Sequence, residues 1–309
     1  MRQTFIKTLV ELAERDPRVM FLTGDLGFMV VEPFSDRFPG RFINVGVAEQ
    51  NMLGIATGLA EGGYLPFVYS IATFATLRPY EFIRDGAVLQ TLPIRIVGVG
   101  GGFEYGHAGA SHFGLEDVGV MRLQPGITVV APADYQQARS ALLATWNAPG
   151  PVYYRLGKND RDALPGLNGA YHDGGVEVVR EGRDALLLSM GAISFEVLKA
   201  ADELAKRGLE ATVAVVACLS PAPSLQLANL LARHSLAISV EAHYVDGGLG
   251  SLVCETVAER QLPCRVVRQG VRRVPVGPSG GEAYLHREHR LSADALIELA
   301  LANRAEVAV

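Results

Sequence analysis

Short apolar runs rich in β-branched and aromatic residues alternate with helix-length segments along almost the whole chain. In the first half, candidate strands lie at 19–24, 41–46, 65–70, 94–100, 128–132 and 151–156, with helical patterns over 49–61, 73–89 and 134–145. Runs that are apolar throughout are typical of strands buried on both faces of a parallel sheet. The sequence therefore predicts an α/β fold with a mostly parallel sheet flanked by helices.

A polar stretch rich in Gly and Asp interrupts this alternation at residues 161–183 and predicts a linker. A second α/β unit follows, with candidate strands at 185–191, 212–219, 236–242 and 264–270 and candidate helices at 194–207 and 224–233. A chain of 309 residues is long for one core. We therefore expect two domains, over 1–160 and 184–309, each with a mostly parallel sheet.

Charge and cysteine content narrow the class of protein. The net charge of −5 offers no basic face for nucleic acid, and no apolar run is long enough to cross a membrane. The N-terminal segment carries charges throughout, unlike a secretory signal. The three cysteines, Cys218, Cys254 and Cys264, show no metal-ligand spacing. These features predict a protein of the reducing cytoplasm that binds neither nucleic acid nor membrane.

Two residues stand out as candidates for chemistry. Glu49, in "NVGVAEQN", has apolar neighbours, and a carboxylate buried there needs a partner or a proton. A place in the first turn of a helix, where the helix dipole favours negative charge, would explain it equally well. His112 lies in a glycine-rich loop that follows the strand at 94–100. Such loops, after the carboxyl ends of parallel strands, are where α/β sheets bind ligands.

Several segments, in order, resemble the transketolase family. They include "TGDLG", the "NVGVAEQNMLGIATGLAEGG" segment, "GASHFGLEDVGVMR", "GPVYYRLGK" and "VEAHYVDGGLGS". The similarity spans nearly the whole chain but covers only the C-terminal half of an ordinary transketolase, namely the pyrimidine-binding and C-terminal domains. The chain thus resembles the C-terminal subunit of a split transketolase.

The resemblance implies thiamine diphosphate as cofactor and gives roles to four residues. Glu49 would hydrogen-bond N1′ of the aminopyrimidine and favour the tautomer that removes the C2 proton. Phe74 would stack on the pyrimidine, and Asp25 would lie near the cofactor. His112 would transfer protons and contact sugar hydroxyls. From the residues alone, Phe74 is equally a core aromatic and Asp25 a turn residue.

The substrate side of the site departs from the family pattern. Arg2 and Arg155 match two arginines that hold a substrate phosphate, and His107 is an additional candidate beside the catalytic loop. Three family positions are changed, namely Met29 for a serine, Gly100 for a histidine and Ala108 for an aspartate. The resemblance therefore implies transfer of a two-carbon ketol unit from a ketose to an aldehyde other than an ordinary aldose phosphate.

The sequence has no GDG motif, which in the family precedes an Asn and holds the divalent cation and diphosphate. The resemblance therefore implies that a separate N-terminal subunit carries the GDG and Asn residues and the Mg²⁺, in a heterotetramer with two of each chain. Two alternatives stay open. One is the beta subunit of a 2-oxoacid dehydrogenase's decarboxylating component, and the other is a non-catalytic regulatory subunit.

Overall fold

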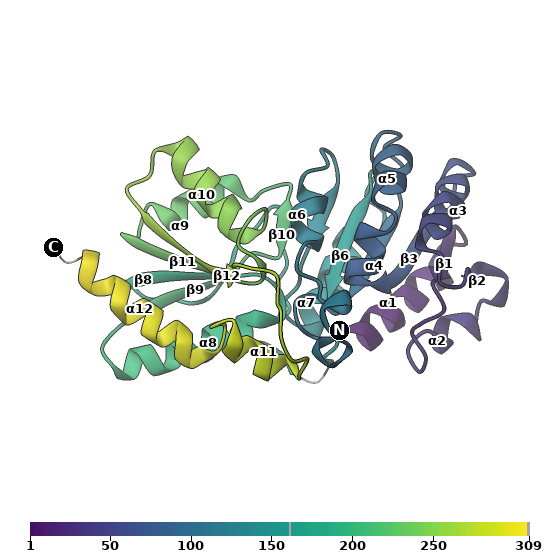
Figure 1. Ribbon diagram of the computed structural model, residues 1–309. Helices are drawn as coiled ribbons and strands as arrows, with labels where there is room; N and C mark the ends of the chain where they lie inside the picture. The colour runs from purple at the N-terminus through teal and green to yellow at the C-terminus, as the bar shows by residue number, and fades with distance from the viewer. Residues whose placement is uncertain (161, 308–309) are drawn as a thin grey trace.

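The structure is a computed structural model that describes residues 1–160 and 162–307 and contains two α/β domains side by side (Figure 1). The first sheet has seven strands in the order β10-β5-β6-β4-β3-β1-β2. Its first-domain strands, all parallel, are β1 (Val19–Thr23), β2 (Phe42–Asn44), β3 (Leu65–Ile71), β4 (Arg95–Val99), β5 (Thr128–Val130) and β6 (Val152–Leu156). The continuous apolar runs therefore form a buried parallel sheet, as predicted.

Helices cover both faces of the first sheet. One face carries α1 (Arg2–Arg15), α2 (Glu32–Ser35) and α7 (Tyr135–Thr145), and the other carries α3 (Glu49–Glu61), α4 (Ala72–Leu77) and α6 (Asp117–Arg122). Helix α1 buries Phe5, Leu9 and Leu12 on one stripe because their spacing follows the helical period. The predicted α/β class is thus confirmed for this domain.

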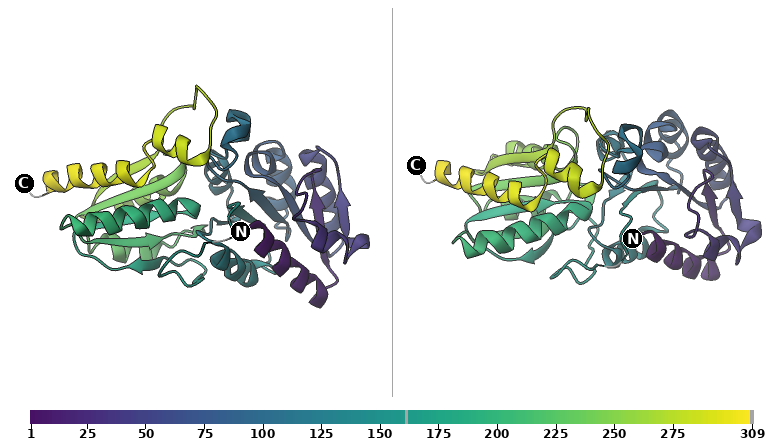
Figure 2. Two further views of the ribbon diagram at one scale, coloured as in Figure 1. Left: turned by 90° about the horizontal axis from the view of Figure 1, so that it is seen from below. Right: turned by 60° about the horizontal axis from the view of Figure 1, so that its bottom comes forward.

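The second sheet has the order β12-β11-β8-β9-β7. Its strands are β7 (Glu177–Arg180), β8 (Ala185–Ser189), β9 (Ala211–Val215), β11 (Leu236–Tyr244) and β12 (Arg265–Val271). Helices α8 (Ser194–Lys206) and α12 (Ala293–Val307) pack on one face, and α9 (Ser224–Leu231) and α10 (Leu249–Arg260) pack on the other. The N-terminus lies near the junction of the two domains, whereas α12 ends at the far end of the second (Figure 2).

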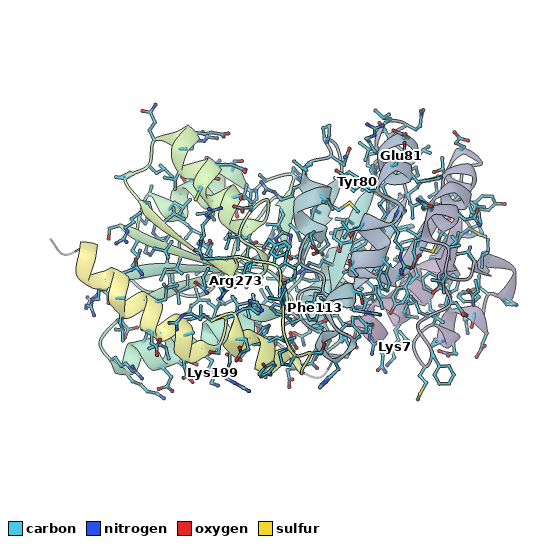
Figure 3. All side chains as sticks on the ribbon, in the orientation of Figure 1. Lys7, Tyr80, Glu81, Phe113, Lys199 and Arg273 are labelled. Atoms are coloured by element: carbon cyan, nitrogen blue, oxygen red, sulfur yellow. The ribbon has the colours of Figure 1, made fainter. Side chains whose placement is uncertain are left out.

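The two domains share buried structure at their junction. One apolar cluster joins Met52 and Val118 of the first domain to Leu188 and Leu252 of the second. Elsewhere at the junction, Phe113 and Arg273 line a cavity of about 290 Å³ together with α11 (Glu282–Glu288) (Figure 3). The domains therefore pack through side chains as well as through the connecting chain.

Two expectations at the domain boundary are wrong. The run 212–219, predicted as one strand, divides into β9 and β10 (Cys218–Ser220), and β10 pairs antiparallel with β5 of the first sheet. Ala131 donates a backbone hydrogen bond to the Ala217 carbonyl, 2.7 Å away, at this crossing. The stretch 161–183 is also not all linker, because β7 pairs antiparallel with β9.

The helical pattern over 73–89 is interrupted. Helix α4 ends at Leu77, a short turn α5 (Tyr80–Phe82) follows, and Ile83–Val88 forms a π-helix. Pro79 lies at the break, where its missing N–H cannot continue the helix. The break leaves Arg78 as the C-terminal capping residue of α4, directly before Pro79.

Across the described residues, none of the helices combines the length and apolar character needed to span a bilayer.

Candidate functional site

Glu49 begins α3, directly after the loop that leaves β2. Its side chain is only 2 % exposed and has two partners. Ser70, on β3, donates its hydroxyl to Oε1 at 3.1 Å, and Arg78 pairs through Nη1 with Oε2 at 2.8 Å. The carboxylate is thus held by a neutral donor on one oxygen and a cation on the other.

Arg78 links this carboxylate to an aromatic pair. Its guanidinium carbon lies 3.8 Å from the centre of the Phe74 ring. The Phe74 and His112 rings meet edge to face, with centroids 5.0 Å apart. The structure therefore brings three predicted residues, Glu49, Phe74 and His112, into one cluster. We call these three residues and Arg78 the Glu49 cluster.

Arg78 was not predicted from the sequence, although a signal for it was present. Arg78 follows Phe74 by four positions, and residues four apart lie on the same face of a helix. Together with Val47 and Gln50, Arg78 and Glu49 line an open cavity of about 650 Å³. An exposed cation beside a nearly buried carboxylate thus forms the wall of this cavity.

His112 ends a one-turn helix in the glycine-rich loop, and its Nδ1 lies 3.0 Å from the Ser111 hydroxyl. The Tyr105 ring lies 6.5 Å from the His112 ring, and Lys158 Nζ lies 4.4 Å from the centre of the Tyr105 ring. Tyr105 also packs against Gly100, where an added Cβ would lie 2.1 Å from Tyr105 Cε2. Tyr105 therefore fills the space that a side chain at position 100 would need.

Asp25 follows β1 in a left-handed turn with φ of 57°. Asn44 Nδ2 donates to its Oδ1 at 3.0 Å, and its own N–H donates to Asn44 Oδ1 at 3.0 Å. Neighbouring Gly24 lies beside Glu49, since an added Cβ there would be 3.6 Å from Glu49 Oε1. Asp25 is thus next to a residue that borders the Glu49 cluster, but its own side chain bonds to Asn44.

Arg2, near the start of α1, places its guanidinium beside the hydroxyls of Tyr69 and Tyr105. It lines a cavity of about 630 Å³ with Lys158 and four carboxylate residues, Glu104, Asp160, Asp162 and Glu282. Burial, together with the Glu282 carboxylate, raises the pKa of Glu104 to about 8. This cavity is more acidic than a simple phosphate site.

Arg155 lies in the domain junction. It is 5 % exposed, and its Nε pairs with Asp117 Oδ2 at 2.8 Å. Its Nη2 donates to the carbonyls of Gly114 and Ala242, one from each domain. His107 is exposed, with its ring near Gly281 of the second domain. The contacts of Arg155 and His107 in the described part of the chain thus lie at the domain junction and not at the Glu49 cluster.

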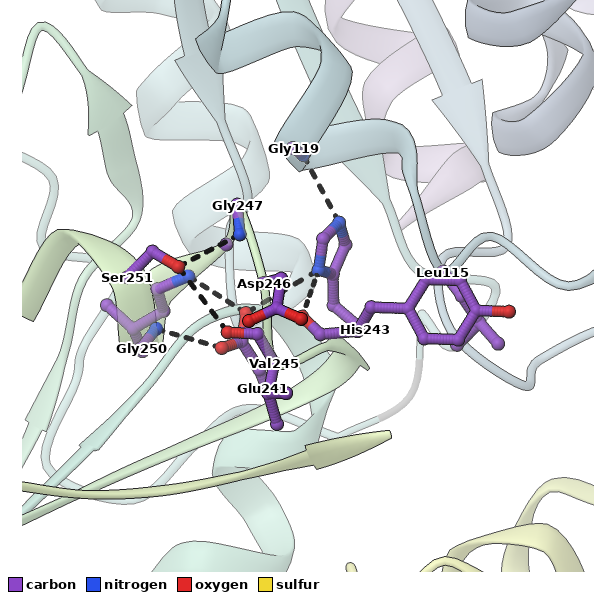
Figure 4. Close-up of polar contacts among 12 residues, drawn as sticks. Leu115, Gly119, Glu241, His243, Val245, Asp246, Gly247, Gly250 and Ser251 are labelled. Atoms are coloured by element: carbon purple, nitrogen blue, oxygen red, sulfur yellow. Dashed lines mark hydrogen bonds and ion pairs between the residues drawn. The ribbon is translucent and has the colours of Figure 1, made fainter. Parts of the chain in front are cut away.

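A second polar network lies at the start of α10 (Figure 4). Glu241 is fully buried and accepts backbone hydrogen bonds from Leu249 and Gly250, each 2.8 Å long. His243 accepts from the Gly119 N–H of α6 through Nε2 at 3.2 Å, and its Nδ1 lies 2.6 Å from the Tyr244 carbonyl. Since Glu241 already occupies this helix N-terminus, the glycine-rich "GGLGS" turn holds an internal carboxylate.

The Glu49 cluster fits the aminopyrimidine end of thiamine diphosphate. An aromatic face beside a carboxylate suits a flat ring with polar nitrogens on its edge. Among the described residues, no group of three or more His, Cys, Asp or Glu side chains could hold a metal ion.

Comparisons with known proteins agree with this geometry. Residues 1–161 match the family model for the transketolase pyrimidine binding domain, and residues 174–296 match that for the transketolase C-terminal domain. An apulose-4-phosphate transketolase subunit from Actinobacillus succinogenes is 32% identical over 271 residues, covering 88% of this chain and 87% of that protein. The 6-deoxy-6-sulfo-D-fructose transketolase subunit SqwH of a Clostridium species is 34% identical over 301 residues, covering 97% and 93%.

A solved structure described as a split gene transketolase in an inactive β4 tetramer superposes with a TM-score of 0.88 at 33% identity, covering 97% of each chain. Both domain models, both relatives and this structure lead to the same conclusion. The chain belongs to the transketolase family and contains that family's pyrimidine-binding and C-terminal domains.

Proposed function

We propose that this chain is the C-terminal subunit of a two-component, thiamine diphosphate-dependent transketolase. It would transfer a two-carbon ketol unit from a ketose to an aldehyde. The observation that carries the proposal is the Glu49 cluster, in which a carboxylate that is 2 % exposed lies beside Phe74 and His112. The relatives that are named as transketolase subunits support the same reaction class.

Glu49, Phe74 and His112 each have a role that their surroundings allow. When bound, the cofactor supplies the electron sink for breaking a carbon–carbon bond beside a carbonyl. Glu49 would hold a proton at the ring nitrogen N1′, and burial would keep water from competing for it. Phe74 would orient the ring by stacking. His112, on the loop after β4, would move protons at the substrate hydroxyl.

The partner subunit is part of the proposal. Mg²⁺ needs several oxygen ligands besides the diphosphate, and we assign them to an N-terminal chain with the GDG and Asn residues. Large apolar side chains are exposed on the loops and helix that carry the site, namely Phe28, Met29, Val47 and Leu77. Large apolar side chains exposed on several elements around one site fit a protein interface. We propose a cytoplasmic heterotetramer with two of each chain.

The test is to produce this chain with its N-terminal partner and to measure ketol transfer with thiamine diphosphate and Mg²⁺. We expect turnover, and Glu49→Gln should lower kcat by orders of magnitude because an amide cannot exchange the required proton. Glu61→Gln is the matched control, since Glu61 is exposed at the other end of α3. Its rate should equal that of the wild type.

Other outcomes separate the alternatives. Decarboxylation of a 2-oxoacid without ketol transfer would identify the chain as a decarboxylating beta subunit. A correctly assembled pair whose turnover is unchanged by Glu49→Gln would contradict a catalytic role and favour a regulatory subunit.

A further inference from the structure

We propose that Arg78 acts as an internal stand-in for the cofactor's aminopyrimidine ring, closing the site until the cofactor displaces it. The inference rests on the proposed function, which assigns Glu49 and Phe74 to that ring. It adds that Arg78, a residue of this chain, competes with the cofactor ring for both residues.

The guanidinium of Arg78 contacts both the Glu49 carboxylate and the Phe74 ring. Arg78 Nη1 lies 2.8 Å from Glu49 Oε2, and the guanidinium carbon lies 3.8 Å from the centre of the Phe74 ring. A guanidinium resembles an aminopyrimidine in that it is flat, carries N–H donors on its edge and stacks on aromatic rings. At 3.8 Å the guanidinium is already in van der Waals contact with Phe74, so no second ring fits between them.

The two side chains of the ion pair differ in their exposure to solvent. Glu49 is 2 % exposed, whereas Arg78 is 43 % exposed. Arg78 ends α4 just before Pro79, so rotation about its side-chain bonds can carry the guanidinium into the open cavity without moving the helix. Ser70 bonds the other carboxylate oxygen, Oε1, and would keep Glu49 oriented after Arg78 leaves.

The Arg78–Glu49 ion pair also offsets the cost of burying the carboxylate. A buried carboxylate without a charged partner destabilises the fold, because its lost hydration is not replaced. Arg78 supplies that partner while the ring is absent. The cofactor must then break a charge-assisted hydrogen bond to bind, so Arg78 lowers the affinity for the cofactor.

The test measures cofactor binding, not turnover, in the two-chain complex. Calorimetric titration with thiamine diphosphate and Mg²⁺ would compare wild type, Arg78→Gln and Arg84→Gln. Gln removes the charge and the stacking cation but keeps an amide donor for Glu49. We expect Arg78→Gln to bind the cofactor at least about tenfold more tightly, as expected when a competing charge-assisted bond is lost.

Arg84 is a suitable control because it is also an exposed arginine in an ion pair on the same segment, but it pairs with Asp85. Arg84→Gln should leave the dissociation constant unchanged. Equal or weaker binding by Arg78→Gln, with normal binding by wild type, would overturn the inference and leave the proposed function standing. A wild-type complex that binds no cofactor would overturn both.

Discussion

Tyr105 shapes the region beside His112 that we propose binds the substrate. It fills the space above Gly100, whose φ of 78° favours glycine, and its ring lies near both His112 and Lys158. The resemblance to the family places a phosphate-holding histidine at position 100, and Tyr105 leaves no room for one. An aromatic wall suits a less hydroxylated aldehyde better than an aldose phosphate.

We therefore expect the assembled enzyme to use ribose 5-phosphate poorly. Its kcat/KM should be about tenfold or more below that for unphosphorylated or deoxygenated aldehydes, given the loss of charge-assisted donors at Met29 and Gly100. Tyr105→Ala should bring the two kcat/KM values closer together, because it removes the aromatic ring. Tyr105→Phe should keep the wild-type difference. Steady-state kinetics with one ketose donor would measure this. A strong preference of the wild type for ribose 5-phosphate would contradict the prediction.

The raised pKa of Glu104 predicts that the stability of the fold depends on pH. Burial and the Glu282 carboxylate raise its pKa to about 8, well above that of a glutamate in the unfolded chain. Between these two pKa values the folded state holds a proton that the unfolded chain releases. The contribution of Glu104 to stability is thus fully present below the unfolded-state pKa, and it is lost as the pH rises towards 8.

Urea unfolding at about pH 5.5 and about pH 8 would measure this effect, because both values lie above the unfolded-state pKa. The free energy of unfolding should fall less between the two pH values in Glu104→Gln than in the wild type. Glu61→Gln should keep the wild-type difference, because Glu61 is exposed on α3. An unchanged difference in Glu104→Gln would show that the proton is held elsewhere.

Among the helices, α10 depends on a carboxylate from a neighbouring strand. Glu241 accepts the N–H groups of Leu249 and Gly250, and an added Cβ at Gly248 would lie only 1.9 Å from Glu241 Oε2. Gly248→Ala should therefore displace the carboxylate and lower the free energy of unfolding by about 1–3 kcal/mol.

Gly58→Ala is the control for this change. Gly58 lies within α3, and an added Cβ there would meet nothing within 4 Å. Because alanine is the better helix former, this variant should gain roughly 0.5–1 kcal/mol. Chemical denaturation of both variants would measure these changes in the free energy of unfolding. Equal stability of Gly248→Ala and wild type would show that α10 tolerates the loss of the Glu241 contact.

At the scale of elements, local patterns predicted most of the fold but not its connections between sheets. The predicted helix over 49–61 coincides with α3, because the apolar stripe and the Gly62-Gly63 pair that follows it are local features of the sequence. The run 212–219 was predicted as one strand because β9 and β10 are equally apolar. β10 joins the first sheet because the edge strand β5 is available there. No local sequence pattern specifies which sheet an apolar strand joins.

The site was predictable to a similar extent. The motif resemblance pointed to Glu49, Phe74 and His112, and the structure brings these residues together. Their link, Arg78, was missed because its role depends on the end of α4 just before Pro79, which places the arginine beside Glu49 of another helix. The contacts of Arg155 arise from the packing of the two domains, which spacing along the chain does not specify.

For the whole molecule, we expect the purified single chain to bind thiamine diphosphate weakly and to catalyse no transfer. We propose that the N-terminal subunit holds the metal ion, so the charged end of the cofactor would have no anchor on this chain alone. Calorimetry on the single chain, then on the chain with its N-terminal partner, would show binding and turnover appearing together. Tight binding with turnover by the single chain would contradict the two-subunit proposal.

Strand β10 has a consequence for anyone who wishes to exchange modules between homologous enzymes. It lies beyond residue 184 in sequence yet completes the edge of the first sheet beside β5. A chimera joined within 161–183 would combine a sheet from one parent with an edge strand from the other. Recombination points that respect the architecture must keep β5 and β10 from the same parent, so the unit of exchange is larger than either domain.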